Sequence, residues 1–203
     1  GTSYDEATSL ALDASGNAYI TGWFRSPTLT FASSTLTNAD NAGITEDIFL
    51  AKYDSNGNLL WTKREGNADK DMVRSLAISA VGGVYMTGCF RGYTITFGST
   101  VLTYAGGGNN GDNTFLTKYD ANGNVLWAKS AGGISTNNPF SVAARYYGEK
   151  EQEEVYITGY FYDATLNFGN FSLPYTGNSC MDFDLFFVKY DGNGNVIWAM
   201  RAG

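Results

Sequence analysis

Short segments in which apolar and polar residues alternate recur along the whole chain, separated by turn-forming residues. In the first third of the chain they cover residues 9–13, 18–24, 47–54 and 59–65, with Asn- and Gly-rich stretches between them. Alternation with a period of two is typical of β-strands that bury one face. Residues 28–37 are rich in β-branched side chains and predict a small hairpin or an irregular extension. Because no segment carries a sustained helical period, we expect an all-β protein.

The same set of segments occurs three times at a nearly constant spacing. A K-Y-D-x-N-G-N-x-x-W motif ends at Trp61, Trp127 and Trp198, and a Y-[IM]-T-G motif lies at one fixed distance before each. Further landmarks in the same phase are Ser9, Ser75 and Ser141; Phe31, Phe97 and Phe168; and Phe49, Phe115 and Phe186. The repeats are residues 1–66, 67–132 and 133–203, and the third carries extra residues between Ala143 and Tyr156. A period of this size predicts units that pack on their neighbours.

Four antiparallel strands per unit, repeated radially, predict the blades of a β-propeller. One blade cannot cover both of its own faces, so we expect Trp61, Trp127 and Trp198 at blade-to-blade contacts. Three blades fall short of the typical count of about four to eight that closes a ring. The expected partners are therefore further copies of the same repeat, either in a longer chain, in a ring of two associated copies, or in an open array.

Composition and charge narrow the class of protein. Glycine and aromatic residues are abundant and proline is scarce, which suits short strands joined by tight turns. The net charge of −7 argues against a nucleic-acid partner. No apolar run is long enough for membrane insertion. The chain begins at Gly1 without Met or a signal peptide, so we expect a processed product or a piece of a longer protein.

Histidine is absent, which removes the commonest general base and metal ligand. The plentiful serines therefore lack the base of the usual triad, and we expect no catalytic residues and no cofactor. The two cysteines are Cys89 and Cys180. Cys89 shares its phase with Trp23 and Tyr160, which predicts a small core residue. A bridge to Cys180 stays open, because it needs a short Cα separation that sequence does not show.

The turns of the K-Y-D-x-N-G-N motif raise the question of a metal site, since their oxygen-bearing residues alternate as in a calcium loop. An EF-hand loop from Asp54 needs Gly at its sixth position, which is Leu59, and Glu at its twelfth. Glu65 fills the twelfth, but its counterparts are Ala. The Asn-Gly step instead predicts a hairpin turn, since both residues tolerate positive φ, and the Asp before the turn can accept backbone amides two residues on. Calcium in another geometry is the alternative, with the candidate ligands Asp54, Asn56, Asn58, Asp120, Asn122, Asn124, Asp191, Asn193 and Asn195.

Residues present in every repeat are most simply structural, so a functional site is expected where the repeats differ. The charged segment 145–154 of the third repeat predicts an enlarged hairpin loop, either solvated or used as a contact. Tyr146, Tyr147 and Tyr175 lie beside loops and are candidates for contact with a carbohydrate or protein ligand. Asp182 and Asp184 are too close in sequence to predict the separation of a glycosidase pair.

Three pieces of the repeat together resemble a known family. They are G-N-x-Y-[IV]-T-G-x-F at residues 16–24, D-x-F-x-x-K-Y-D-x-N-G-N-x-x-W at 47–61 and F-G-x-x-x-L at 97–102. The combination resembles the bacterial β-propeller repeat called SBBP over essentially the whole chain. The second and third repeats depart from it at the turn that residues 15–17 form in the first. The resemblance implies large secreted or surface-anchored bacterial proteins with tandem repeats and adhesive modules, and it implies no activity.

We therefore expect a non-enzymatic extracellular or cell-surface module from a bacterium, in which repeated sheets form a scaffold for protein–protein interaction. A carbohydrate-binding propeller is one alternative, and the non-catalytic part of a larger secreted hydrolase is another. A protein or glycan ligand is the expected partner besides further repeats.

Overall fold

The computed structural model describes residues 2–40, 42–105, 111–133, 135–148, 152–162, 164–177 and 182–203. The Cys89–Cys180 bridge and the tip of the charged segment, residues 149–151, lie outside the described residues. All regular secondary structure within them is strand, and no described helix could cross a membrane.

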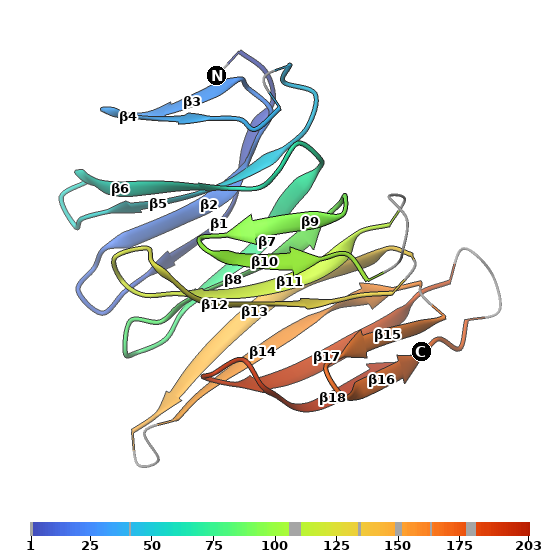
Figure 1. Cartoon of the computed structure of the whole chain (residues 1–203). Coiled ribbons are helices and arrows are strands. Elements are labelled where there is room, and N and C mark those ends of the chain that lie inside the picture. Colours follow the sequence, from blue (N-terminus) through green and yellow to red (C-terminus); the bar gives the residue numbers. More distant parts are fainter. Residues whose placement is uncertain are drawn as a thin grey trace.

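Three sheets of four antiparallel strands stand side by side like an opened fan (Figure 1). Blade 1 contains β1 (Asp5–Leu12), β2 (Ala18–Phe24), β5 (Asp47–Tyr53) and β6 (Leu59–Glu65). Blade 2 contains β7 (Asp71–Ile78), β8 (Val84–Phe90), β11 (Asn113–Tyr119) and β12 (Val125–Ala131). Blade 3 contains β13 (Asn137–Tyr147), β14 (Gln152–Phe161), β17 (Asp184–Asp191) and β18 (Val196–Ala202). This architecture confirms the predicted fold class.

A small hairpin interrupts each blade between its second and third strands. The hairpins are β3 (Thr28–Phe31) with β4 (Ser34–Thr37), β9 (Thr94–Phe97) with β10 (Thr100–Thr103), and β15 (Thr165–Phe168) with β16 (Phe171–Pro174). Each hairpin packs on the outermost strand of its own blade, and the hairpins of blades 2 and 3 also reach the outermost strand of the blade before them. The innermost strands β1, β7 and β13 contact one another in sequence order. The blades are therefore joined both near the centre of the fan and at its rim.

The hydrophobic core lies between the sheets, in one cluster at each junction. At the junction of blades 1 and 2, Tyr19 and Leu50 pack against Met86 and Phe97 among others. The second cluster is built mostly from the counterparts of these residues one repeat later, such as Tyr85, Leu116, Ile157 and Phe168. Burial contributes about 25 cal/mol per Å² of apolar surface, so packing against a neighbour stabilises each blade.

Hydrogen bonds across each junction repeat with the sequence period. The Leu76 amide donates to Ser9 Oγ at 3.1 Å, and the Val142 amide donates to Ser75 Oγ at the same distance. These bonds account for the serine that recurs in phase, because it fixes the innermost strand of the next blade.

The recurring tryptophans make a second such bond. Trp61 Nε1 donates to the Ala121 carbonyl at 3.4 Å, and Trp127 Nε1 donates to the Gly192 carbonyl at 3.0 Å. Both carbonyls belong to a turn of the following blade, as the sequence predicts for residues at blade contacts. Trp198 occupies the same place on the outer face of blade 3, beside Phe187, with ring centroids 5.0 Å apart.

The structure confirms the predicted hairpin turn at Asn56 and Gly57, which joins β5 to β6 with a register shift. Gly57 has a φ of +83°, whereas Asn56 is not among the described residues with positive φ. The Gly57 amide donates to the Asp54 carbonyl at 3.0 Å, and the Asp54 amide donates to the Asn58 carbonyl at 2.9 Å. Asp54 Oδ1 also accepts the amides of Asn56 and Asn58, which holds the longer, bulged turn in place of the two-residue one.

The charged segment of the third repeat is not an enlarged loop. Its described residues continue β13 to Tyr147 and begin β14 at Gln152, so both strands are lengthened. The extension lets Glu153 reach blade 2, where it bonds Lys118 Nζ and accepts Ser79 Oγ at 2.5 Å. Burial raises the pKa of Glu153, but the bonds from Lys118 and Ser79 outweigh it and leave the pKa below its usual value. The insertion therefore ties blade 3 to blade 2.

Two equivalent tryptophans test the role of blade packing. We expect Trp127→Ala to lower the free energy of unfolding by roughly 3–5 kcal/mol, because it removes a ring packed between two blades. The matched change Trp198→Ala should cost clearly less in the dilute protein, since no blade of the chain covers that face. Urea unfolding of both variants measures the difference, and equal losses would contradict this packing.

Candidate functional site

Four positions that are charged at the junction of blades 1 and 2 are neutral at the junction of blades 2 and 3. The charged set is Asp47, Arg64, Glu65 and Asp71, and its counterparts one repeat later are Asn113, Ser130, Ala131 and Asn137. Since the two junctions are formed by equivalent strands and mostly equivalent apolar positions, this replacement marks the first junction as the candidate site.

Asp47 begins β5 and is fully buried. Its Oδ2 accepts the Ala39 amide at 2.8 Å and Arg64 Nη1 at 2.9 Å, while Oδ1 has no hydrogen-bond partner among the described residues. Burial raises the pKa of Asp47, and the bonds from Ala39 and Arg64 only partly offset that effect.

Asp71 begins β7 of the next blade and approaches Asp47 across Gly66. A Cβ on Gly66 would lie 2.8 Å from Asp47 Oδ1 and 3.0 Å from Asp71 Oδ2, so only glycine fits between the two carboxyl groups. Asp71 Oδ2 accepts the Asn67 amide at 2.7 Å, and its Oδ1 is buried without a partner in the described part of the chain. Burial and the nearby charges of Asp47 and Asp69 raise the pKa of Asp71 well above its usual value. The two acids thus form a buried pair that resists ionisation.

The second junction replaces this pair with amides. Asn113 and Asn137 are both fully buried, and a Cβ on Gly132 would lie 2.0 Å from Asn113 Oδ1. The close approach of the glycine to the first side chain is therefore kept, while the charge and the titration are removed.

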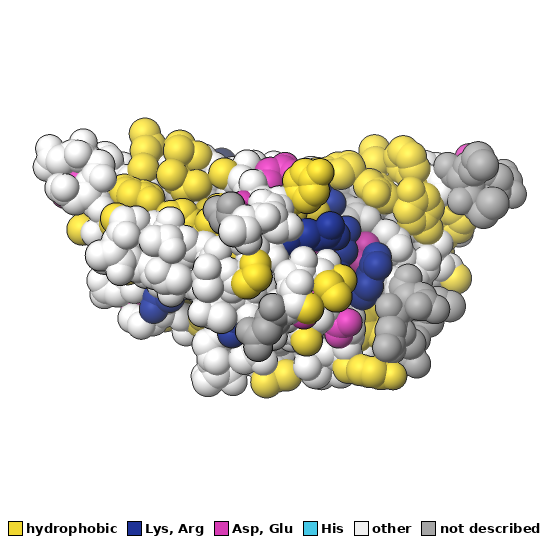
Figure 2. Space-filling view, turned by 90° about the horizontal axis from the view of Figure 1, so that it is seen from above, with side chains coloured by type: hydrophobic (Ala, Val, Ile, Leu, Met, Phe, Trp, Pro, Cys, Tyr) yellow, Lys and Arg dark blue, Asp and Glu magenta, His cyan; other side chains and the backbone are white. Residues whose placement is uncertain are grey.

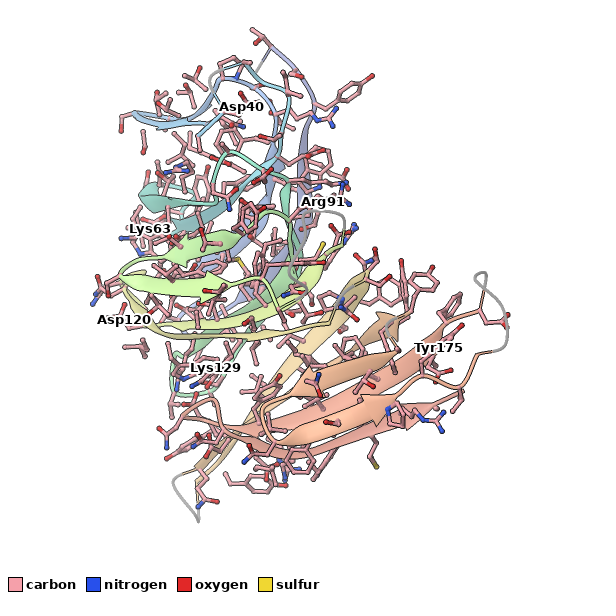
Figure 3. The ribbon with its side chains drawn as sticks, turned by 45° about the vertical axis from the view of Figure 1, so that its right-hand side comes forward. Asp40, Lys63, Arg91, Asp120, Lys129 and Tyr175 are labelled. Carbon is pink, nitrogen blue, oxygen red and sulfur yellow. The ribbon has the colours of Figure 1, made fainter. Side chains whose placement is uncertain are left out.

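A groove of about 470 Å³ opens beside the acid pair, between β6 of blade 1 and the β9–β10 hairpin of blade 2. Its lining is mostly polar and comprises Lys63, Arg64, Glu65, Gly66, Thr96, Gly98, Ser99, Gly123, Asn124 and Val125. The equivalent groove at the next junction, about 300 Å³, is lined by Lys129, Ser130 and Phe171 among others. Lys63 and Lys129 lie along one side of the molecule in Figure 3, with Asp120 near them.

Glu65 is the distinctive group of the larger groove. It is 8% exposed, and Tyr119 donates its hydroxyl to Glu65 Oε1 at 3.3 Å. Burial raises the pKa of Glu65 to about 7, although Tyr119, the Gly98 backbone and the charges of Arg64 and Lys63 lower it. Glu65 can therefore exchange a proton near neutral pH and bond a polar ligand in either form. It is the one carboxyl group among the described lining residues, so the groove does not supply the two acids of a glycosidase.

In the turns that are the candidate calcium sites, the Asp carboxylate oxygens already accept hydrogen bonds. Asp54, Asp120 and Asp191 each accept two backbone amides on Oδ1, and each Oδ2 accepts the side-chain amide of the last Asn of the turn, 2.8–2.9 Å away. These bonds lower the pKa of Asp54, which is half-buried. No group of three or more Asp, Glu, His or Cys side chains that could hold a metal ion occurs among the described residues.

The structure does not bring the three candidate tyrosines together. Tyr146 and Tyr147 lie at the far end of β13, and Arg145 stacks over the Tyr147 ring at 3.5 Å. Tyr175 packs against Phe161, which pairs with Asn137 at the opposite end of the strand, roughly 30 Å away. The Tyr175 hydroxyl donates to the Asp182 carbonyl at 2.9 Å. Figure 3 shows Tyr175 on the other side of the molecule from Lys63 and Asp120.

Blade 3 also carries a group of aromatic side chains that was not predicted as a site from the sequence. Tyr160 lies at its centre, with ring centroids 5.1 Å from Phe140, 5.3 Å from Tyr162 and 5.1 Å from Phe183. Phe140 and Phe183 are exposed. Their counterparts in the other repeats are polar or charged, so a comparison of the repeats in phase could have found this group.

No protein-family model matches the sequence. The chain is 26% identical, over 97% of its length, to the uncharacterized WD repeat-containing protein L264 of Acanthamoeba polyphaga mimivirus, of which it covers 16%. It is 30% identical over 48% of its length to the regulatory protein FlaEY of Caulobacter vibrioides, of which it covers 10%. Among solved structures, the Dos1 propeller aligns with 99% of this chain and 62% of that one, with 11% identity and a TM-score of 0.33. The repeated blades and the WD-repeat relative support a β-propeller-like repeat protein; the SBBP family in particular stays a prediction.

The raised pKa of Glu65 predicts a pH-dependent cost. The folded state keeps the proton to about pH 7 while the unfolded state loses it near pH 4.5, so stability falls as pH rises between these values. We expect Glu65→Gln to be more stable than the wild type by up to about 3 kcal/mol above pH 7, with the gain vanishing below pH 4.5. Urea unfolding across this range measures the gain, with Glu6→Gln on an exposed site as control. A gain that does not vary with pH would contradict the shift.

The acid pair makes a parallel prediction. Because the pKa of Asp71 is raised in the folded state, its contribution to stability is lost as pH rises above the usual value of 3.8. Asp71→Asn copies Asn137 and should flatten the fall of the melting temperature with pH, whereas Glu6→Gln, at an exposed site of β1, should not. If Asp71→Asn instead lowers the melting temperature at every pH, the two carboxyl groups do not oppose each other.

Proposed function

We propose that this chain is a non-enzymatic interaction module, a scaffold whose blade faces and grooves are contact surfaces for other proteins. The observation that supports it most is the exposed apolar surface of blade 3, where Phe183, Leu185, Phe187 and Met200 are between 43% and 52% exposed. Contiguous apolar surface of this kind typically marks an interaction site. The WD-repeat relative is consistent with this role.

The proposal also includes a cellular location and a bacterial origin. The resemblance to SBBP repeats supports an extracellular or cell-surface protein of a bacterium, which acts without a cofactor. In that setting a rigid row of sheets holds its contact surfaces at fixed spacing, as repeat proteins commonly do. A role as the non-catalytic part of a larger secreted hydrolase uses the same surfaces.

Carbohydrate binding is the second candidate, and the aromatic group around Tyr160 favours it. Rings grouped within 5.1–5.3 Å of one another, with Phe140 and Phe183 exposed, offer apolar faces on which a sugar ring can stack. The polar groove beside Glu65 offers hydrogen-bonding groups for sugar hydroxyls.

A glycan array with the purified chain separates the two candidates. The scaffold proposal predicts no saturable binding to any glycan class and no turnover of a panel of glycoside, ester and peptide substrates. Saturable binding to one class that Tyr160→Ala abolishes, while Tyr146→Ala leaves it intact, would replace the scaffold with a carbohydrate-binding module. Calorimetric titration with calcium belongs to the same test, and a flat titration is expected because the turn carboxylates are already bonded.

A further inference from the structure

The outer face of blade 3 carries the same positions that blades 1 and 2 use to pack on the next blade, but no described blade packs on it. We define the blade-3 face by residues that point away from blade 2: Tyr156, Leu185, Phe187, Trp198 and Met200. Phe187 is 43% exposed, whereas its counterparts Leu50 and Leu116 are 0% and 1% exposed because the next blade covers them. Met200 stands where blades 1 and 2 carry Lys63 and Lys129. This face is therefore more apolar than the faces that the chain itself buries.

The outer face of blade 1 carries the positions that blades 2 and 3 use to pack on the blade before them. Leu10 is 59% exposed, whereas Leu76 and Val142, which hold the same place in blades 2 and 3, are each 6% exposed. Leu12, on the same side of β1, is 61% exposed. Figure 2 looks from above onto the end of the fan where blade 1 lies, and shows exposed hydrophobic side chains in several patches beside a group of Lys and Arg side chains. We call the surface around Leu10 and Leu12 the blade-1 face.

The donors and acceptors that bond at the two internal junctions have counterparts on the blade-3 face and the blade-1 face. Ser141 is the counterpart of Ser9 and Ser75, which accept the amides of Leu76 and Val142, and the next amide in the series is that of Leu10. In the same way Trp198 Nε1 corresponds to the donors of the other two junctions, and its matching acceptor is the Ser55 carbonyl on the first turn of this kind.

The charged positions select which blade fits. At the first junction Asp47 and Arg64 meet Asp71 of the next blade. At the second junction the corresponding residues are Asn113, Ser130 and Asn137. Blade 3 carries Asp184 with Arg201, whose Nη1 lies 3.2 Å from Asp184 Oδ2, so it is of the first kind. The residue that blade 1 presents at the matching position is Asp5, whereas a copy of blade 3 presents Asn137. The chain's own first blade is thus the matching partner.

We propose that the blade-3 face docks against the blade-1 face of a second copy of this chain, head to tail. The proposal deepens the proposed function, because it names the partner of the apolar face on which that function rests. The contact joins two different surfaces, so it closes into a ring or continues, depending on the rotation per blade. Two copies together supply six blades, within the range of about four to eight in closed propellers.

Two single variants and their mixture test the direction of the contact. Phe187→Lys places a charge on the blade-3 face and Leu10→Lys places one on the blade-1 face; both positions are exposed, so both variants should fold. Leu126→Lys is the matched control, since Leu126 is 55% exposed on blade 2, which has a neighbour on each side. Sedimentation velocity over a wide concentration range gives the association state, and circular dichroism checks folding.

We expect the wild type and Leu126→Lys to associate, and each face variant alone to weaken association by roughly thirtyfold or more. The mixture of the two face variants should form a one-to-one dimer, because Phe187→Lys keeps an intact blade-1 face and Leu10→Lys keeps an intact blade-3 face. Wild-type protein that stays monomeric throughout, a Leu10→Lys variant that still associates alone, or a mixture that stays monomeric would each overturn the proposal. The glycan array and substrate panel are read on the monomeric variants as well, so failure of head-to-tail docking and failure of the scaffold role are told apart.

Discussion

Contact between neighbouring sheets is the constraint on which this structure depends. Each sheet has two apolar faces and no helix among the described residues to cover either of them. Only another sheet of the same kind supplies the matching side chains, the serine that accepts an inner-strand amide and the turn carbonyl that accepts a tryptophan N–H. Stability is then approximately a sum of neighbour terms, as in other repeat proteins.

The two junctions meet this constraint with different polar chemistry. Blades 2 and 3 are joined by neutral amides at their start and by the Glu153–Lys118 pair at their far end. Blades 1 and 2 bury Asp47 against Asp71 and place Glu65 in a groove, which costs free energy when these acids ionise. Such buried polar groups are costly for folding alone, so their presence at one junction is consistent with a functional role there.

Much of the fold could be predicted from sequence because the period and the alternation of side chains are local properties. The strand at residues 18–24 and the hairpin within 28–37 were predicted with nearly the observed bounds. The turn at Asp54, including its side-chain bonds to backbone amides, was also predicted, but its bulged form was not, because the register shift depends on the full set of bonds around Asp54. The role of Glu153 depends on a lysine and a serine of another blade, and a charged stretch of sequence does not reveal such contacts.

The positions of the candidate site, though not their packing, could have been predicted from the sequence. Aligning the repeats in phase shows Asp47, Glu65 and Asp71 as the positions where charge replaces neutral residues. That these residues are buried together, with carboxyl oxygens left unpaired on each side of Gly66, follows only from the packing of two blades. The three tyrosines, in contrast, lay at opposite ends of blade 3, because position beside a loop does not determine which end of a strand a residue occupies.

Hydrogen–deuterium exchange of the dilute, monomeric chain tests the central claim most directly. Blade 2 has a neighbour on each face, so the amides of β8 and β11 should exchange most slowly, and those of β2, β5, β14 and β17 faster because one face of each outer blade is open. Equal protection in all three blades, or slowest exchange in blade 3, would mean that each sheet is stable without its neighbours and would contradict the account.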